Sequence, residues 1–267
     1  MPVPTRTSAD SNSSADINTL QSQITAGVAF TLSTPGTNQT LTSASAVRQS
    51  MAPSADIDVT LDNSFSAGST VEIHNMSTTK VLTLKSNDGD TICKIIPLSY
   101  LVIMAKQATP TDATHWSTKG AGGGWASAGT VAGNFSAGFG TVTNITSKIK
   151  REGETAIISL VWQNGTVTTG AGTIVIPFGL TASTGSFTSR RRYGDIMLLN
   201  SSGQTIYTTT NSVGVGYYNG SNADKIAVAM NSNSNDYQAS NVSDIMTSSE
   251  YYEAELRIPI SGWEINN

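Results

Sequence analysis

Strict alternation of apolar and polar residues is the feature that most constrains the fold of this chain. In the segment 56–61, Ile57, Val59 and Leu61 alternate with polar residues, and in the segment 253–260 every second residue is apolar. Successive side chains of a β-strand point to opposite faces of a sheet, so this period of two predicts strands with one buried face. Turn-forming residues recur about every 8–12 positions, as in β-sandwiches and jelly rolls. We therefore expect an all-β protein.

Glycine recurs throughout residues 120–140, and no acidic residue lies between Asp112 and Glu152. Such a change of composition is typical of a connector, which is either flexible or closely packed. We expect this glycine-rich linker to separate a β domain at residues 26–119 from a jelly-roll-like head at residues 141–267.

Three local patterns give sharper expectations. The continuous apolar run Leu101–Met104 predicts a strand that is buried on both faces. The segment Ser86–Asp90 contains Asp-Gly and predicts a hairpin turn, and Asn164–Gly165 predicts a two-residue hairpin turn with positive φ values. No fixed-period repeat of the solenoid or propeller kind is evident in the sequence.

The first 25 residues are polar apart from a small apolar set at Ile17, Leu20 and Ile24. Spacings of three and four residues place this set on one face of a short helix, and Asp16 favours its first turn through the helix dipole. We expect residues 1–25 to be an anchoring segment that orders on a partner; the alternative is a frayed tail.

Composition excludes several classes of function. The net charge of −4 argues against binding to a nucleic-acid backbone. No run of about 18 apolar residues is present, so we expect no membrane insertion. The first residues lack the apolar core of a secretory signal, so we expect no secretory leader. With one cysteine and two histidines, we expect neither an internal disulfide nor a cysteine-rich metal site, and no cofactor.

Residue patterns for catalysis are weak. His74 and His115 have no second ligand at metal-binding spacing, and Cys93 lies in an apolar run, so we expect structural roles for all three. Asp88 and Asp90 lack the further oxygen ligands of a calcium loop and are interpreted as turn residues. The glycine-rich stretch lacks the lysine of a phosphate-binding loop.

Two carboxylate pairs have the spacing that would put both members on one face of a strand. They are Glu152 with Glu154, and Glu253 with Glu255. We interpret both pairs as parts of solvated outer faces and expect no enzyme activity; the alternative is acid–base cleavage of glycosidic bonds.

Two segments have the composition of a ligand-binding surface. One is a basic cluster and the other a tyrosine-rich loop, in which tyrosine offers contact area at little entropic cost. The candidate residues are Arg190, Arg191, Arg192, Tyr217, Tyr218 and Asn219. The alternatives are a charged guard against edge-to-edge aggregation for the first segment and an unpartnered surface hairpin for the second.

Three stretches resemble a known group of proteins. Residues 9–20, which contain Ala-Asp-Ile-Asn-Thr-Leu, resemble the N-terminal segment of some tailed-bacteriophage fibre proteins. Residues 59–75 resemble β modules of phage virion surface proteins. Residues 257–263, Arg-Ile-Pro-Ile-Ser-Gly-Trp, are similar to the final strand of C1q/TNF-like trimeric heads at phage fibre tips.

This resemblance implies a homotrimeric protein of the virion surface. The N-terminus would attach to the major capsid protein or another virion protein, and the C1q/TNF-like head would project and adhere to a host surface glycan. Association of small β domains also buries strand faces and protects exposed edges. The absence of shaft repeats favours a head fibre or decoration protein. The alternatives are a tail fibre or receptor-binding tip, a glycan-cleaving spike that uses Glu152 and Glu154, and a lectin-like module.

Overall fold

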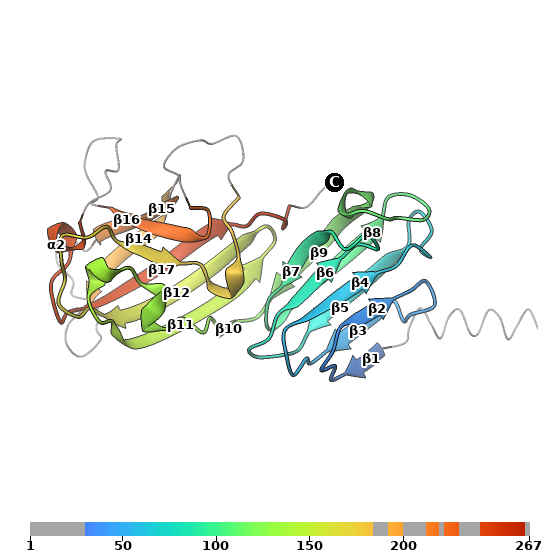
Figure 1. Cartoon of the computed structure of the whole chain (residues 1–267), viewed down its shortest axis with the longest axis horizontal. Helices are drawn as coiled ribbons and strands as arrows, with labels where there is room; N and C mark the ends of the chain where they lie inside the picture. Colours follow the sequence, from blue (N-terminus) through green and yellow to red (C-terminus); the bar gives the residue numbers. More distant parts are fainter. Residues whose placement is uncertain (1–29, 184–191, 200–211, 219–221, 230–240, 265–267) are drawn as a thin grey trace, which may run out of the picture.

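The chain is a two-part β protein in the computed structural model. The residues described are 30–183, 192–199, 212–218, 222–229 and 241–264. Within them the α-helix α2 (Val242–Ile245) is a single turn, and strands dominate. The all-β expectation is thereby confirmed. Figure 1 shows an N-terminal and a C-terminal unit side by side along the long axis. No helix of the described residues combines the length and the apolar character needed to cross a membrane.

The N-terminal unit consists of two facing sheets that the chain visits alternately. Its strands are β1 (Phe30–Ser33), β2 (Gln39–Leu41), β3 (Arg48–Met51), β4 (Ile57–Leu61), β5 (Thr70–Asn75), β6 (Leu82–Lys85), β7 (Thr91–Ile95), β8 (Ser99–Ala105) and β9 (Trp116–Gly123). Strands β1, β3 and β5 are parallel in one sheet, and β2, β4 and β6 are parallel in the other. Antiparallel strands follow, with β7 beside β6 and β8 and β9 beyond β5. The unit is a short parallel coil that ends in antiparallel strands.

This coil has no constant sequence period. Phe30 pairs with Arg48, 18 residues on, whereas Arg48 pairs with Glu72, 24 residues on. Loops of different length between successive rungs account for the difference. The coil is therefore invisible to a search for fixed repeats, although its parallel pairing is regular.

Alternation predicts the inner face of this unit correctly. Ile57, Val59 and Leu61 of β4 are buried, as expected. Strand β8 departs from the expectation, because Leu101 and Ile103 are buried while the residues between and after them are only half-buried. The apolar run is thus buried on one face and only half-buried on the other. The turn after β6 is confirmed, with Gly89 at φ +89°.

The C-terminal unit is antiparallel throughout. Its strands are β10 (Ala126–Ser127), β11 (Thr143–Glu152), β12 (Thr155–Gln163), β13 (Thr173–Val175), β14 (Arg192–Leu199), β15 (Ser212–Tyr218), β16 (Lys225–Ala229) and β17 (Tyr251–Pro259). They are ordered β11-β12-β17-β14-β15-β16-β13, and β10 pairs with β11. Short 3-10 turns lie between these strands and are η3 (Ala132–Asn134), η4 (Ala137–Phe139) and η5 (Pro177–Gly179); a further one, η2 (Ala113–His115), precedes β9 in the N-terminal unit. Pro259 ends β17, as expected from its missing N–H.

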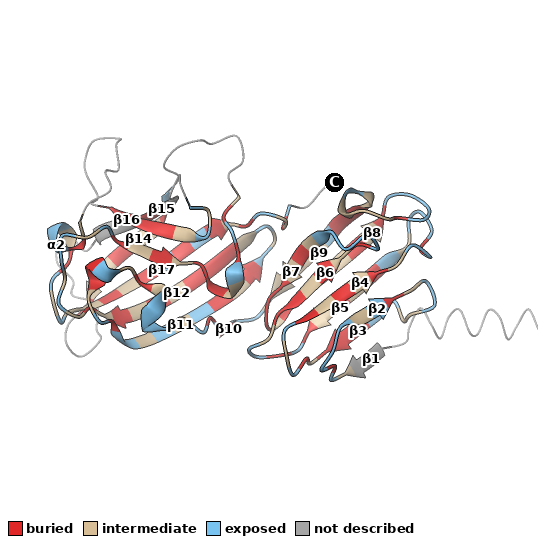
Figure 2. Ribbon diagram, in the orientation of Figure 1, coloured by how far each residue is buried: buried red, intermediate tan, exposed pale blue. Residues whose placement is uncertain are grey.

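An aromatic cluster fills the core of this unit. Trp162 packs against Phe135, Phe139 and Tyr252, with ring centroids 5.6–6.2 Å apart. Phe135 also forms a β-bridge with Ile174 of β13, at the opposite end of the sheet from β10. The chain between β10 and Phe135 therefore passes from the side of β11 to the side of β13. Figure 2 shows buried positions alternating with less buried ones along several strands of the unit.

The glycine-rich stretch differs from the linker expected at 120–140. Residues 120–123 belong to β9, where Gly122 pairs with Tyr100 on one side and with Glu152 on the other. A Cβ on Gly123 would lie 2.7 Å from the Ser99 Cβ, so glycine permits a close approach of two strands here. The glycines join the two units in one continuous sheet of 13 described strands.

The expected hairpin at Asn164–Gly165 is wrong. Strand β12 pairs with β11 and β17 and not with the strand that follows it. Asn164 is buried, and its Oδ1 accepts a hydrogen bond from Trp162 Nε1 at 2.9 Å. A Cβ on Gly165 would lie 2.4 Å from the Thr141 nitrogen. The asparagine thus satisfies a buried indole, and the glycine makes room for a neighbouring backbone.

Candidate functional site

The predicted anchoring residues Asp16, Ile17, Leu20 and Ile24 lie outside the described residues. The same holds for three members of the predicted ligand-binding surface, namely Arg190, Arg191 and Asn219.

The described members of that surface lie on neighbouring strands. Arg192 begins β14, is exposed, and forms an ion pair with Asp195. Tyr217 and Tyr218 end β15, and the strand register places Tyr217 directly opposite Arg192. The fold therefore brings together two segments that the sequence analysis singled out separately.

The two histidines make local contacts with carboxylates. His74 Nε2 lies 2.6 Å from Glu72 Oε1, and its ring stacks on Tyr100 with centroids 5.5 Å apart. His115 Nε2 lies 3.0 Å from Asp112 Oδ2 in the turn before β9. Across the described ranges, no three His, Cys, Asp or Glu side chains are placed to share a metal ion. The histidines take part in pairs that order the surface.

The glutamate pairs lie on outer surfaces of the sheet and its turns. Glu152 is exposed and contacts Arg257 at 3.2 Å and Lys150 at 3.7 Å. Glu255 is likewise exposed and lies 3.6 Å from Arg257. These carboxylates face arginine and lysine rather than one another, which is the arrangement of a solvated charged face.

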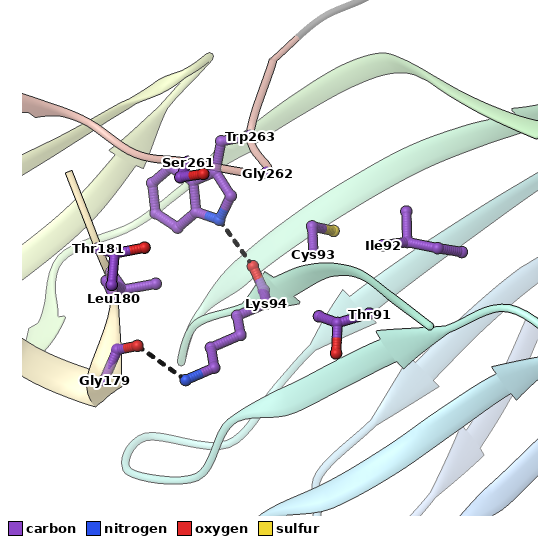
Figure 3. Close-up of a pocket in the computed structure, with 10 residues that line it drawn as sticks. All are labelled: Thr91, Ile92, Cys93, Lys94, Gly179, Leu180, Thr181, Ser261, Gly262 and Trp263. Atoms are coloured by element: carbon purple, nitrogen blue, oxygen red, sulfur yellow. Dashed lines mark hydrogen bonds between the residues drawn. The ribbon is translucent and has the colours of Figure 1, made fainter. Parts of the chain in front are cut away.

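A different site lies where the two units meet. A hollow of about 220 Å³ is bounded by residues 91–94 of β7 and by two segments of the C-terminal unit, 179–181 and 261–263 (Figure 3). The Trp263 indole N–H donates to the Lys94 carbonyl oxygen at 2.9 Å. The Lys94 ammonium in turn donates to the carbonyl oxygens of Phe178 and Gly179, at 3.1 and 2.9 Å. One residue of β7 is thereby held at both its backbone and its side chain.

The backbone at η5 is shaped for this contact. Phe178 has φ +60° and ψ 20°, in the left-handed region that non-glycine residues seldom adopt. This conformation costs on the order of 1–2 kcal/mol. The two bonds from Lys94 use the carbonyl groups that the turn presents, so the junction holds the strained backbone in place.

Behind the hollow lies a buried cation. Arg151 is 1% exposed, and its guanidinium lies 4.3 Å from the centroid of the Trp263 ring. Its Nε donates to the Gly153 carbonyl oxygen at 2.9 Å, while its two Nη atoms have no hydrogen-bond partner in the described part of the chain. Burial lowers the Arg151 pKa, and attraction to Cys93 and Glu154 opposes that effect. The guanidinium is thus held by its Nε hydrogen bond and by a cation–π contact with the Trp263 indole.

Cys93 lies in the same layer and is fully buried. Burial raises the pKa of its thiol to about 11, although the neighbouring Arg151 favours the thiolate. At neutral pH the sulfur is therefore a protonated thiol and a poor nucleophile. The junction thus lacks an activated nucleophile, and its contacts act as a clamp between the two units.

Sequence reasoning did not find this clamp. A usable signal existed, because Arg151 stands two positions after Ile149 and so shares its inward face on a predicted strand. A charged residue at an inward position needs a buried partner. The partner, Trp263, is distant in the chain, and only the fold brings it near.

Comparison of the sequence with models of known protein families and with curated proteins finds no match.

Proposed function

We propose that this protein is a non-enzymatic structural component of a bacteriophage virion, a homotrimeric head fibre or decoration protein displayed on the capsid surface. Residues 1–25 attach it to the major capsid protein or another virion protein. The C-terminal unit is a jelly-roll-like, C1q/TNF-like head that projects and adheres to a host surface glycan. The proposal combines the resemblance of residues 9–20, 59–75 and 257–263 with the arrangement of the fold.

The observation that supports it most is the clamped junction between the units. The Trp263–Lys94 hydrogen bond and the pairing of Gly122 with Glu152 join the units directly. Strand β1 lies at the end of the sheet farthest from β13, on the side of the N-terminal unit away from the C-terminal unit (Figure 1). A chain that is anchored before β1 would therefore hold the C-terminal unit outward.

A tail fibre or receptor-binding tip is the second candidate. The pairing of Arg192 with Tyr217 supports it, because the two candidate binding segments meet on the projecting unit. Antibody labelling of intact virions, viewed by electron microscopy, separates the candidates. Label on capsids supports the head fibre, and label at tail tips supports the alternative.

Deletion of residues 1–25 tests the anchoring role. The truncated protein is expected to fold but to be missing from purified virions, with full-length protein as the control. Normal incorporation of the truncated protein would contradict the proposed attachment.

A further inference from the structure

Trp125 is distinguished from the other tryptophans by its exposure. Trp116, Trp162 and Trp263 are at most 3% exposed, whereas Trp125 is 43% exposed. It lies directly before β10, which pairs with β11. An exposed indole offers a flat apolar face against which a ligand ring can pack.

A hollow of about 430 Å³ adjoins this indole. This volume is within the range of small-ligand sites, roughly 300–1,000 Å³. Apart from Trp125 and Ile145, its lining is rich in hydroxyl and backbone groups, from Ser127, Thr130, Thr146 and Ser147. A flat ring beside several hydroxyl groups suits a sugar, which offers C–H groups to the ring and hydroxyls to the polar rim.

The charge at the hollow has one sign. Lys148 lines it, and the Lys150 ammonium lies 5.3 Å from the centroid of the Trp125 ring, which orients the ring. No carboxylate belongs to the lining, and the sequence has no Asp or Glu from residue 113 to residue 151. Glu152 is the nearest acid to this cluster along β11, and it is engaged by Arg257 and Lys150. Lys148 forms no ion pair with another described residue, so an anionic ligand would meet an available cation here.

We propose that the hollow beside Trp125 binds an acidic saccharide unit, such as a uronic acid. The sugar ring packs on the Trp125 indole, its carboxylate accepts a hydrogen bond from Lys148, and its hydroxyls bond to the Ser and Thr residues of the rim. This inference rests on the host-adhesion part of the proposed function and places adhesion at the start of the C-terminal unit.

Tryptophan fluorescence tests the site directly, because Trp125 is the indole that a quencher can reach. Acrylamide quenching of the full-length protein is measured with trigalacturonate and, as a neutral match of equal length, with maltotriose. Trigalacturonate is expected to protect Trp125 and maltotriose is not. In Lys148→Ala, we expect about tenfold more trigalacturonate to be needed for the same protection, because one charge-assisted hydrogen bond is lost.

Lys119→Ala is the matched control, since Lys119 is an exposed lysine of β9 outside the lining, and it is expected to leave protection unchanged. Trp125→Ala is followed by saturation-transfer NMR of trigalacturonate, and the transfer is expected to vanish while circular dichroism stays native. Absence of protection, or equal protection by maltotriose, would overturn the proposal. If Trp125 is shielded from acrylamide without saccharide and becomes accessible when the protein is diluted, a second copy of the chain covers it. That result would also overturn the proposal. The antibody labelling of virions uses no saccharide. A negative result in the saccharide experiments would therefore not affect the test of the structural role in the virion.

Discussion

Trp263 and Lys94, 169 residues apart in the chain, are joined by a hydrogen bond from the indole N–H to the lysine carbonyl oxygen at 2.9 Å. The bond ties the end of the C-terminal unit to β7 of the N-terminal unit. The same indole lies against the Arg151 guanidinium. One side chain therefore links three parts of the molecule.

Replacement of Trp263 by alanine should be strongly destabilising. The indole is fully buried, and truncation of such a side chain costs about 3–5 kcal/mol. Trp125→Ala, at an exposed indole, is the matched control and should cost much less. Urea unfolding followed by circular dichroism compares them, and equal losses of stability would contradict the role of the clamp.

Arg151 provides a test of what a buried charge contributes. Its two Nη atoms are buried without hydrogen-bond partners among the described residues, so a long apolar side chain should be tolerated. We expect Arg151→Met to change the unfolding free energy by less than about 1 kcal/mol or to raise it. Arg151→Ala should lower it by about 2–4 kcal/mol, because the packing on Trp263 is lost. Denaturant titration measures both variants, and a methionine variant as unstable as the alanine variant would refute the argument.

Cys93 makes stability depend on alkaline pH. Its folded-state pKa of about 11 lies above the ordinary value of 9.0. The unfolded chain therefore loses this proton first as the pH rises. The stability that the protonated Cys93 thiol contributes to the folded state is complete below pH 9. It is lost progressively between pH 9 and about pH 11. Thermal unfolding across this window should show a steeper fall for the natural protein than for Cys93→Ala, and parallel curves would argue against it.

Two glycines of β9 should respond oppositely to alanine. A Cβ on Gly123 would lie 2.7 Å from the Ser99 Cβ and 2.9 Å from the Leu98 oxygen, so strands must move apart. We expect a loss of about 1–3 kcal/mol. A Cβ on Gly120 meets nothing closer than 3.9 Å, at Val102, and alanine there should be neutral or stabilising. Melting temperatures of the two variants test this contrast, and equal shifts would be inconsistent with close packing at Gly123.

The sequence predicts those strands that have one buried face and one solvent-exposed face. Strands β4 and β17 follow directly from alternation at Ile57–Leu61 and Ala254–Ile258, because the pleat makes burial alternate with the same period. The run at Leu101–Met104 misleads, because apolar residues are tolerated on the half-buried outer face of β8.

Features that depend on pairing between distant segments could not be predicted from the sequence. The parallel coil was missed because its rungs differ in length, and Asn164–Gly165 was misassigned because a buried indole and a close backbone override local turn preference. The clamp at Lys94 was missed for a related reason, since a strand pattern places Lys94 on an outer face without indicating what covers it. At the proposed ligand surface, by contrast, composition alone selected Arg192 and Tyr217, and the strand register brings them together.

The proposed homotrimer is tested most directly by the molar mass of the full-length protein in solution, measured by light scattering during size-exclusion chromatography. We expect three times the mass of one 27.9 kDa chain, unchanged on dilution through the micromolar range. A species with the mass of a single chain at every concentration would contradict it.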